Sequence, residues 1–170
     1  MTTPRFNYAL EPLSSQHNRA DFTCGVEALD RYLKEQAGQD LRRFLAAVFV
    51  LEDLDNQRLA GYYTLAATSI ELADLPKQLT KKLPKYPRLP ATLLGRLAVD
   101  FRYSGQGLGT FLLLDALYKS LNAEIASMAV VVDAIDERAK AFYEYHQFIP
   151  LTEQSSRLYL PMTTIAKMFN

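Results

Sequence analysis

A glycine-rich segment holds the residues whose types and spacing are best suited to bind a ligand, Arg102-Tyr103-Ser104-Gly105-Gln106-Gly107-Leu108-Gly109-Thr110. Glycine has no Cβ atom, so the backbone at these three glycines is able to approach a ligand closely. A helical pattern follows over residues 107–121, and the N-terminus of a helix presents unpaired N–H groups and the positive end of the helix dipole. The segment therefore predicts a site for the pyrophosphate of a phosphate-bearing cofactor.

The elements around this segment predict a mixed α/β fold. Apolar runs predict strands at residues 7–12, 46–51, 58–70, 93–99, 129–134 and 158–160. Helical spacing predicts helices at residues 26–39, 77–83, 107–121, 137–146 and 162–169, with another turn at 40–44. The segment 52–57 is rich in turn residues, so the strands on either side should form an antiparallel hairpin. This order of elements indicates a mixed sheet with helices on both faces.

Composition sets limits on the type of protein. The 170 residues suit one domain, residues 1–170, with a full hydrophobic core. Lys and Arg together number 19, as do Asp and Glu, so contact with a polyanion requires a local basic patch. The single cysteine, Cys24, excludes an internal disulfide. Residues 1–5 lack the apolar stretch of a signal peptide, and no segment approaches the roughly 20 apolar residues of a membrane span. We expect a soluble cytoplasmic protein that makes no membrane contact.

The glycine-rich segment is compatible with two classes of cofactor, a dinucleotide and acyl-coenzyme A. A dinucleotide-binding fold requires G-x-G-x-x-G, followed about 20 positions later by an acidic residue. Gly105 and Gly107 match the first two glycines, and Asp133 lies at a tolerable distance, but Thr110 occupies the third glycine position. An antiparallel hairpin also precedes the segment, which is unusual for that fold. The second class is acyl-coenzyme A.

The second class is favoured by a resemblance to a known family. Arg102-x-x-Gly105-x-Gly107 resembles the pyrophosphate loop of the GNAT superfamily of N-acetyltransferases, whose pattern is Gln/Arg-x-x-Gly-x-Gly/Ala. Residues 139–148, AKAFYEYHQF, resemble the family's A-x-x-F-Y-x-x-x-G-F helix, which follows the fifth strand, and Gln147 stands where the family has glycine. The resemblance implies one domain with a mixed, mostly antiparallel sheet flanked by helices and with splayed central strands.

Three further segments narrow the resemblance to the GNAT toxins of bacterial type II toxin–antitoxin pairs. They are residues 21–33, which contain DFTCG and LDRYL, residues 61–65, GYYTL, and residues 94–100, LGRLAVD. This resemblance implies that acetyl-CoA is the cofactor and that the α-amine of aminoacyl-tRNA is acetylated, which blocks translation. It also implies a ribbon-helix-helix antitoxin as partner, and a homodimer is a further expectation.

The expected cofactor site comprises the loop and the ends of two strands. Main-chain amides would hold the pyrophosphate, with Arg102 adding charge, at residues Arg102, Gly105, Gln106, Gly107, Leu108, Gly109 and Thr110. The backbone of the preceding strand, at Leu97, Ala98 and Val99, would pair with the pantetheine arm as an added strand does. Asp133 and Ala134 end the neighbouring strand, where a splayed gap would admit the thioester.

Tyr143 is the expected catalytic acid, because the family places this tyrosine beside the coenzyme sulfur. A phenol with an ordinary pKa of about 10 is protonated at neutral pH and donates a hydrogen bond or a proton to a departing thiolate. The alternative is a core aromatic residue, since Phe142 and Tyr145 flank it. No general base stands out, because Glu52, Asp53 and Asp55 fall in a turn, where carboxylates are expected to be solvated. That absence suits an α-amine, with a pKa of about 7.7–8.0, better than a lysine at about 10.4.

A cluster of basic residues predicts an RNA-binding patch, although the same pattern is equally typical of a solvated loop. The cluster is Lys77, Lys81, Lys82, Lys85 and Arg88, with Arg42 and Arg43 as further members. His17 and His146 have no metal-ligand spacing, so no metal site is expected. Cys24 is expected to be a buried small residue.

Two alternatives to the tRNA-acetylating toxin remain open. In the first, the same chemistry acetylates a protein N-terminus or a small-molecule amine. In the second, the chain is a catalytically silent module that binds coenzyme A.

Overall fold

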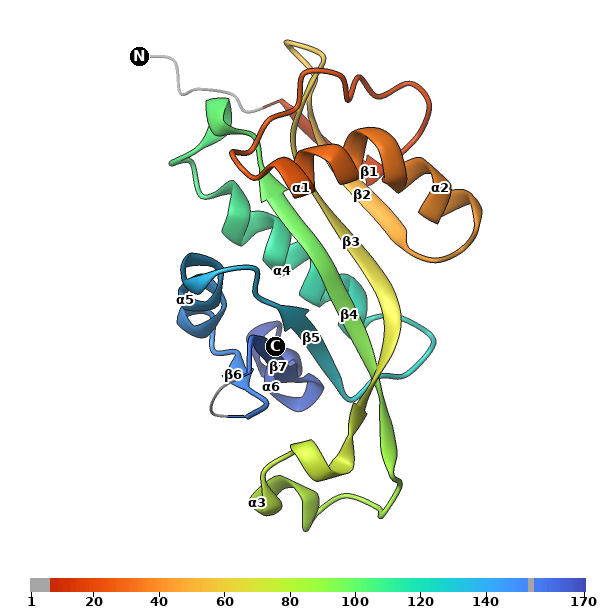
Figure 1. Ribbon diagram of the computed structural model, residues 1–170, viewed down its shortest axis with the longest axis vertical. Coiled ribbons are helices and arrows are strands. Elements are labelled where there is room, and N and C mark those ends of the chain that lie inside the picture. The colour runs from red at the N-terminus through yellow and green to blue at the C-terminus, as the bar shows by residue number, and fades with distance from the viewer. Residues whose placement is uncertain (1–6, 153–154) are drawn as a thin grey trace. The chain divides into compact units, whose positions relative to one another are not determined.

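An antiparallel hairpin forms one side of the sheet in this computed structural model, which describes residues 7–152 and 155–170 (Figure 1). Strand β2 (Ala47–Asp53) pairs with β3 (Arg58–Glu71), and β1 (Tyr8–Pro12) pairs antiparallel with β2. The hairpin was predicted from the turn-rich segment, but the turn starts later than predicted because residues 52 and 53 still belong to β2. The prediction that residues 1–5 form no signal peptide lies outside the described residues.

The remaining strands are β4 (Arg88–Val99), β5 (Ala129–Asp133), β6 (Ile149–Pro150) and β7 (Arg157–Pro161). Within the described residues the sheet has seven strands in the order β1-β2-β3-β4-β5-β7-β6. β4 and β5 are parallel, whereas β5 and β6 each pair antiparallel with β7. The mixed, mostly antiparallel sheet was predicted, but the two-residue strand β6 is too short to produce a sequence pattern.

Helices connect these strands at nearly the predicted positions. They are α1 (Glu27–Arg31), α2 (Ala37–Arg42), α3 (Lys77–Thr80), α4 (Leu108–Leu121), α5 (Glu137–Tyr145) and α6 (Met162–Met168). The predicted helix at residues 26–39 is divided, because a π-helical turn, Tyr32–Gln36, separates α1 from α2. Phe44, with φ of +60°, follows the end of α2.

The chain forms two compact units, of which unit 1 consists of Met1–Leu65 and Arg96–Asp115. Its core packs the first helices against the hairpin, with Leu33, Val50 and Tyr62 fully buried. A Cβ atom at Gly61 would lie 2.8 Å from both the Ala98 carbonyl oxygen and Leu112 Cδ1. Glycine at position 61 therefore allows α4 to pack directly against the sheet.

Unit 2 consists of Ala66–Gly95 and Ala116–Asn170. Its core includes Val131 and Tyr159, and the whole of β5 except Asp133 is buried. A continuous β-branched run is what a parallel strand needs when both of its faces are covered. Among the described residues no helix combines the length and the apolar character that crossing a membrane would require.

The parallel pairing of β4 with β5 is short. It joins Thr92, Leu93 and Leu94 to Val130, Val131 and Val132, whereas β4 itself continues to Val99. Hydrogen bonding between these strands therefore ends before β4 does, as expected for splayed central strands.

Candidate active site

The glycine-rich loop adopts a conformation that requires glycine and leaves its backbone open. Gly105 and Gly107 both have φ of +77°, in the left-handed region where a Cβ atom is unfavourable. No other atom lies within 4 Å of the position that a Cβ would occupy at either residue. Apart from the chain neighbours, the space on the Cβ side of both glycines is therefore open.

Helix α4 adds N–H groups to this loop. It begins at Leu108, and the Phe111 N–H donates to the Gly107 carbonyl at 3.1 Å. Leu108 and Gly109 are the first two residues of the helix, and the N–H groups at a helix N-terminus have no carbonyl acceptor within the helix. Oriented amides and the positive helix end are the features that bind a pyrophosphate. The loop therefore combines the features of a pyrophosphate-binding segment, and its binding of coenzyme A stays a prediction.

The side chain of Gln106 holds the loop in place. Its Oε1 atom accepts a hydrogen bond of 3.2 Å from the Tyr8 hydroxyl on β1. This contact ties the loop to β1 through the side chain of Gln106.

Arg102 is held by two acidic residues of unit 1. Its guanidinium donates to both carboxylate oxygens of Asp100, at 2.9 and 2.8 Å, and to the Asp21 backbone carbonyl at 2.9 Å. Asp100 is fully buried and also accepts from the Thr23 N–H at 3.0 Å. Burial by itself raises the pKa of Asp100, but the hydrogen bonds from Arg102 and Thr23 outweigh it and hold that pKa below its ordinary value. The charge of Arg102 is thus largely compensated, and its observed contacts position the loop.

Sequence reasoning missed Asp100 as a member of the site. The Asp100 carboxylate also accepts from the backbone N–H of Arg102 at 2.9 Å and so caps the short turn that leads from β4 to the loop. An acidic residue at the end of a strand, two positions before an arginine, was the signal available.

The end of β4 alternates between two environments. Ala98 is buried in the core of unit 1, whereas Leu97 and Val99 are half-buried and point to the opposite face of the strand. This alternation is typical of a strand that packs one face against the core and leaves the other face partly exposed. The pairing of these residues with a pantetheine arm stays a prediction.

Tyr143 lies on α5 in unit 2, with its ring buried between two aromatic neighbours. Its ring centroid is 5.2 Å from that of Phe142 and 5.4 Å from that of Phe148. Among the described residues its hydroxyl has no hydrogen-bond partner, and none of their fully buried polar side-chain atoms lacks one. The phenolic oxygen therefore keeps some exposure while the ring is enclosed. Burial raises the pKa of Tyr143, so the phenol keeps its proton at neutral pH.

The C-terminus of α5 fixes the position of Tyr143. The Phe148 N–H donates to the Tyr143 carbonyl at 3.0 Å, and the Gln147 N–H donates to the Glu144 carbonyl at 3.0 Å. This pair of bonds is the Schellman motif, whose left-handed residue is usually glycine. Gln147 occupies that place with φ of +74°. The departure from the family's glycine therefore leaves the helix end intact, at the cost of a strained residue.

Asp133 and Ala134 use part of their hydrogen-bonding capacity within unit 2. Arg157 on β7 donates to both carboxylate oxygens of Asp133, at 2.8 and 3.0 Å. The Ala134 N–H donates to the Ser156 carbonyl at 2.8 Å. Tyr143, Asp133 and Ala134 belong to unit 2, whereas the loop and the end of β4 belong to unit 1.

The predicted basic patch is exposed but falls into two groups. The members in unit 2 lie on α3, in the segment after it and at the first residue of β4, namely Lys77, Lys81, Lys82, Lys85 and Arg88. Arg88 forms an ion pair of 3.2 Å with Glu71, whereas the lysines form none within the described residues. Arg42 and Arg43 lie at the end of α2 in unit 1.

The expectation of solvated carboxylates is wrong for Asp53, which is buried. It accepts hydrogen bonds from the Tyr103 hydroxyl at 2.5 Å and from Asn56 Nδ2 at 2.7 Å. Burial would raise its pKa, but these bonds lower it. Cys24 is half-buried rather than buried, and burial together with a hydrogen bond to Asp30 raises the pKa of its thiol to about 11. Asp53 is therefore a weak base, and Cys24 is not a thiolate at neutral pH.

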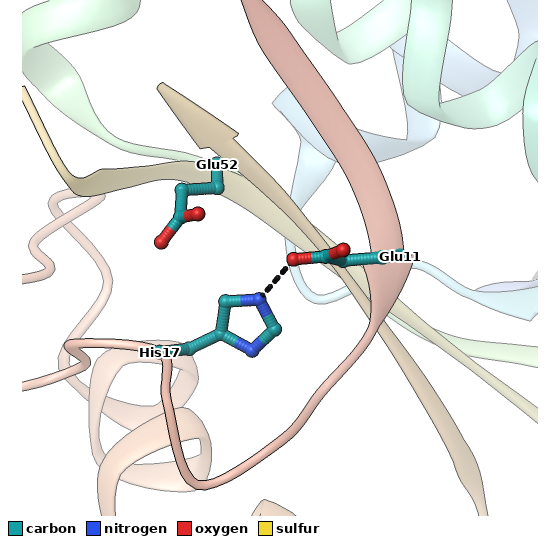
Figure 2. Close-up of side chains that lie close together, drawn as sticks. All are labelled: Glu11, His17 and Glu52. Carbon is teal, nitrogen blue, oxygen red and sulfur yellow. Dashed lines mark hydrogen bonds and ion pairs between the residues drawn. The ribbon is translucent and has the colours of Figure 1, made fainter. Parts of the chain in front are cut away.

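Tertiary structure gathers three possible metal ligands that their spacing in the sequence did not reveal. They are Glu11, His17 and Glu52, whose side chains lie close together in Figure 2. Their possible ligand atoms all lie within 4.8 Å of one another, and the three residues line an open cavity of about 370 Å³. The backbone N–H of Ser14 donates to His17 Nδ1 at 2.9 Å, so the ring proton is on Nε2, which donates to Glu11 at 2.7 Å.

This tautomer does not suit a metal ligand. In metal sites the protonated nitrogen of a histidine faces a second-shell acceptor and the bare nitrogen faces the metal. In this protein the bare nitrogen of His17 is occupied by the Ser14 N–H. The contact between His17 and Glu11 therefore fixes the loop after β1.

Comparison with known proteins identifies the family to which this chain belongs. No family model matches the chain. The chain is 31% identical to "Probable toxin TacT" of Sinorhizobium fredii, over 94% of this chain and 93% of the relative. It is 33% identical to the "tRNA-acetylating toxin" of Mycobacterium tuberculosis, over 80% of this chain and 81% of the relative.

Solved structures agree with these relatives. A tyrosine-to-phenylalanine mutant of KacT matches with a TM-score of 0.91 and 33% identity, over 95% of this chain and 99% of KacT. AtaT complexed with acetyl-methionyl-tRNAfMet matches with a TM-score of 0.88 and 30% identity, over 96% of this chain and 100% of the AtaT chain. An AtaT mutant bound to the C-terminus of the antitoxin AtaR and to acetyl-CoA matches with a TM-score of 0.82 and 27% identity, over 96% of this chain and 98% of the AtaT chain. With its glycine-rich loop, its Tyr143 helix and these similarities along most of its length, the chain belongs to the GNAT-type toxins of bacterial toxin–antitoxin systems.

Proposed function

We propose that this protein is an N-acetyltransferase toxin that transfers an acetyl group from acetyl-CoA to the α-amine of aminoacyl-tRNA and so blocks translation. The observation that carries this proposal is the open main chain at Gly105 and Gly107, leading into the N-terminus of α4. The relative from M. tuberculosis is a tRNA-acetylating toxin, and AtaT has been solved with an acetylated tRNA. Both similarities support the same substrate class for this chain.

Acetyl-CoA supplies the acetyl group as an activated thioester. Amides at residues 105–110 bind its diphosphate, and the Asp100–Arg102 pair keeps these amides in position. The backbone at Leu97, Ala98 and Val99 pairs with the pantetheine arm, and Asp133 and Ala134 mark the end of the strand beside which the thioester enters. The AtaT structure that contains acetyl-CoA supports acetyl-CoA as the cofactor.

Tyr143 holds a proton at its phenolic oxygen for the departing sulfur. Packing of the ring against Phe142 and Phe148 positions the phenol, and its raised pKa keeps the proton in place until a thiolate forms. A positioned acid of this kind contributes about 10²- to 10⁴-fold to the rate. A tyrosine-to-phenylalanine replacement characterises the KacT and AtaT mutant structures, which agrees with a tyrosine at the centre of the reaction.

The carboxylates of unit 1 favour an α-amine as substrate. Asp53 and Asp100 are both buried, hydrogen-bonded and lowered in pKa, so they are weak bases. A lysine amine with a pKa of about 10.4 needs a strong base, whereas an α-amine at about 7.7–8.0 is substantially neutral near pH 7.5. The amine of an aminoacyl ester therefore reacts without a dedicated base.

The partners follow from the same proposal. RNA contacts the exposed lysines around α3 and the arginines at the end of α2, and a ribbon-helix-helix antitoxin neutralises the toxin, as AtaR binds AtaT. The activity occupies residues 1–170 as one domain and takes place in the cytoplasm, where charged tRNA is found. A homodimer is part of the proposal and awaits a measurement of mass in solution.

The test is transfer of labelled acetyl from acetyl-CoA to charged tRNA by the purified protein. Wild type should label the RNA, whereas Tyr143→Phe should lower kcat by about 10²- to 10⁴-fold. Both proteins should bind acetyl-CoA equally well, which separates loss of chemistry from loss of binding. Labelling of peptide N-termini or small amines but not of charged tRNA would replace the proposed substrate. Binding of coenzyme A without turnover on any amine would identify a silent module.

A further inference from the structure

A hollow in unit 1, separate from the glycine-rich loop, is lined by residues that bind anions. It lies between the loop after β1 and helix α2, and has a volume of about 210 Å³. It is lined by Leu13, Ser14, Ser15, Arg19, Gly38, Leu41 and Arg42. Since a water molecule fills about 30 Å³, the hollow has room for a tetrahedral oxyanion and several waters.

Two guanidinium groups converge in this hollow, which we call the α2 hollow. A Cβ atom at Gly38 would lie 3.2 Å from Arg42 Nη1 and 3.5 Å from Arg19 Nη1. Both side chains therefore reach the same point above α2, and the absence of a side chain at position 38 makes room for them. Guanidinium groups match the geometry of a phosphate, to which they donate two parallel hydrogen bonds.

The helix backbone anchors one of the two arginines. Arg19 Nη1 donates to the Leu33 carbonyl at 3.1 Å, within the π-helical turn Tyr32–Gln36. Such turns are rare and occur frequently at functional sites. This anchor fixes the head of Arg19 without neutralising its charge, because its partner is a carbonyl and not a carboxylate.

The opposite wall is a turn that a histidine holds rigid. The Ser14 N–H donates to His17 Nδ1, the His17 N–H donates to the Ser14 carbonyl at 3.3 Å, and His17 Nε2 is tied to Glu11. The contact of His17 with Glu11, which Figure 2 shows, therefore helps to hold the turn that contains Ser14 and Ser15. Among the described residues no partner is found for the Ser15 hydroxyl, which is exposed and available as a donor.

The charges of the α2 hollow are not balanced by acidic residues. Among the described residues neither Arg19 nor Arg42 forms an ion pair with a carboxylate. Asp40, the one acidic residue of α2, accepts from Tyr32 and Gln36 instead. Glu11 is engaged by His17. Two converging cations without a counter-ion favour binding of an anion from solution.

The geometry points to a phosphate-binding subsite formed by Arg19, Arg42 and the Ser14–Ser15 turn, and its occupant is a backbone phosphate of the RNA substrate. The RNA as source rests on the proposed function, whereas the phosphate chemistry rests on the hollow alone. A free phosphate ion shares that chemistry and is distinguished by the experiment. The subsite adds Arg19 and Gly38 to Arg42, which the sequence pattern had placed in a general basic patch.

The first experiment measures binding of uncharged tRNA to the full-length protein over a range of salt concentrations. Arg42→Gln should weaken binding about five- to tenfold at low salt and reduce the slope of log K against log salt by about one. The matched control is Arg31→Gln, which removes the same charge from the exposed face of α1, outside the hollow. Acetyl-CoA affinity should be equal in all three proteins, because the glycine-rich loop is untouched.

A second variant separates geometry from charge. Gly38→Ala keeps both arginines but pushes their terminal nitrogens apart, since the new Cβ would stand 3.2 Å from Arg42 Nη1. It should weaken tRNA binding two- to fivefold while the melting temperature stays equal or rises, because alanine is a better helix residue than glycine. A loss of binding with an unchanged or higher melting temperature is not explained by misfolding.

The source of the phosphate is tested with inorganic phosphate, by its effect on melting temperature. Stabilisation of wild type but not of Arg42→Gln, together with weaker tRNA binding by Arg42→Gln, supports the subsite as inferred. The same stabilisation with tRNA binding unchanged would assign the site to free phosphate and overturn its RNA role. If Arg42→Gln and Arg31→Gln behave alike in both assays, there is no subsite. Failure to acetylate charged tRNA would refute the proposed function only, since none of these measurements depends on turnover.

Discussion

The glycine-rich loop and the end of α5 contain the same unusual backbone conformation for two different purposes. Gly105 and Gly107 have φ of +77°, and Gln147 has φ of +74°. In the loop the residues are glycines and the space around them is open. At the end of α5 the residue is a glutamine, and the conformation closes the Schellman motif that holds Tyr143.

The difference teaches that a left-handed residue is not by itself a sign of a binding site. In the loop the backbone itself is the functional group, so a side chain would obstruct the ligand as well as strain the chain. On α5 the functional group is a side chain, and the left-handed residue only ends the helix. A side chain at position 147 therefore costs conformational energy but blocks nothing.

The largest effect is expected from removing the support beneath the loop. Asp100→Asn replaces a fully buried carboxylate that accepts from Arg102 and Thr23, and leaves the guanidinium with only the more distant carboxylate of Asp21, at 3.4 Å. We expect the free energy of unfolding at pH 7 to fall by about 2–4 kcal/mol. Chemical denaturation measures this value.

The pH dependence of that difference provides its control. Asp100 has a pKa below its ordinary value of 3.8 in the folded protein, so its contribution is complete above pH 3.8 and is lost as the pH falls through the folded value. The gap between wild type and Asp100→Asn should therefore narrow in acid. A constant gap down to pH 2 would show that the charge of Asp100 is not what stabilises the loop.

An exchange of residue types tests the comparison itself, beginning with Gly107→Gln. The substitution introduces about 1–2 kcal/mol of left-handed strain and places a side chain beside the amides. Acetyl-CoA binding should weaken about 10- to 100-fold, and isothermal titration calorimetry measures it. Wild-type affinity in this variant would mean that the loop amides do not bind the cofactor.

The reverse exchange, Gln147→Gly, should have a smaller effect of opposite sign. Glycine accepts φ of +74° without strain, so the free energy of unfolding should increase by about 1 kcal/mol. Acetyl-CoA affinity and kcat should not change, because Tyr143 keeps its place. A fall in kcat would contradict the view that position 147 only ends the helix.

The smallest effect concerns the pH–rate profile, in which we expect no fall in rate from ionisation of Tyr143. The rate should rise between about pH 6 and 8 as the substrate α-amine loses its proton. Because burial raises the pKa of Tyr143, the acid stays protonated beyond its ordinary value of 10, and no falling limb should arise from it below that pH. Single-turnover rates up to pH 9 test this. A falling limb that disappears in Tyr143→Phe would refute the raised pKa.

Most elements of the fold were predictable because their hydrophobic patterns are local. The hairpin β2–β3, the buried strand β5 and helix α4 appear within a few residues of their predicted bounds. The π-helical turn before α2 and the strand β6 were missed. The first keeps the helical spacing of side chains and changes only the backbone bonding, and the second is too short for any periodicity.

The candidate site was predictable where one segment carries the chemistry and not where several must meet. Gly105 and Gly107 could be identified from the sequence because glycine adopts a positive φ more readily than other residues. Asp100 and Asp53 gave no such sign, since each depends on a partner far away in the sequence, Thr23 and Tyr103 respectively. Arg102 was assigned a charge for the ligand, yet its charge is directed at Asp100.

By itself the sequence determined where the backbone bends, which segments are buried and which short motif presents free amides, because these follow from residue type and local spacing. Only the tertiary structure decided which charges are compensated and which remain. A carboxylate such as Asp100 becomes a support, and a pair such as Arg19 and Arg42 becomes an anion site, through neighbours that folding brings together. Electrostatic roles depend on distance in space, and sequence spacing does not encode that distance beyond one turn or one strand.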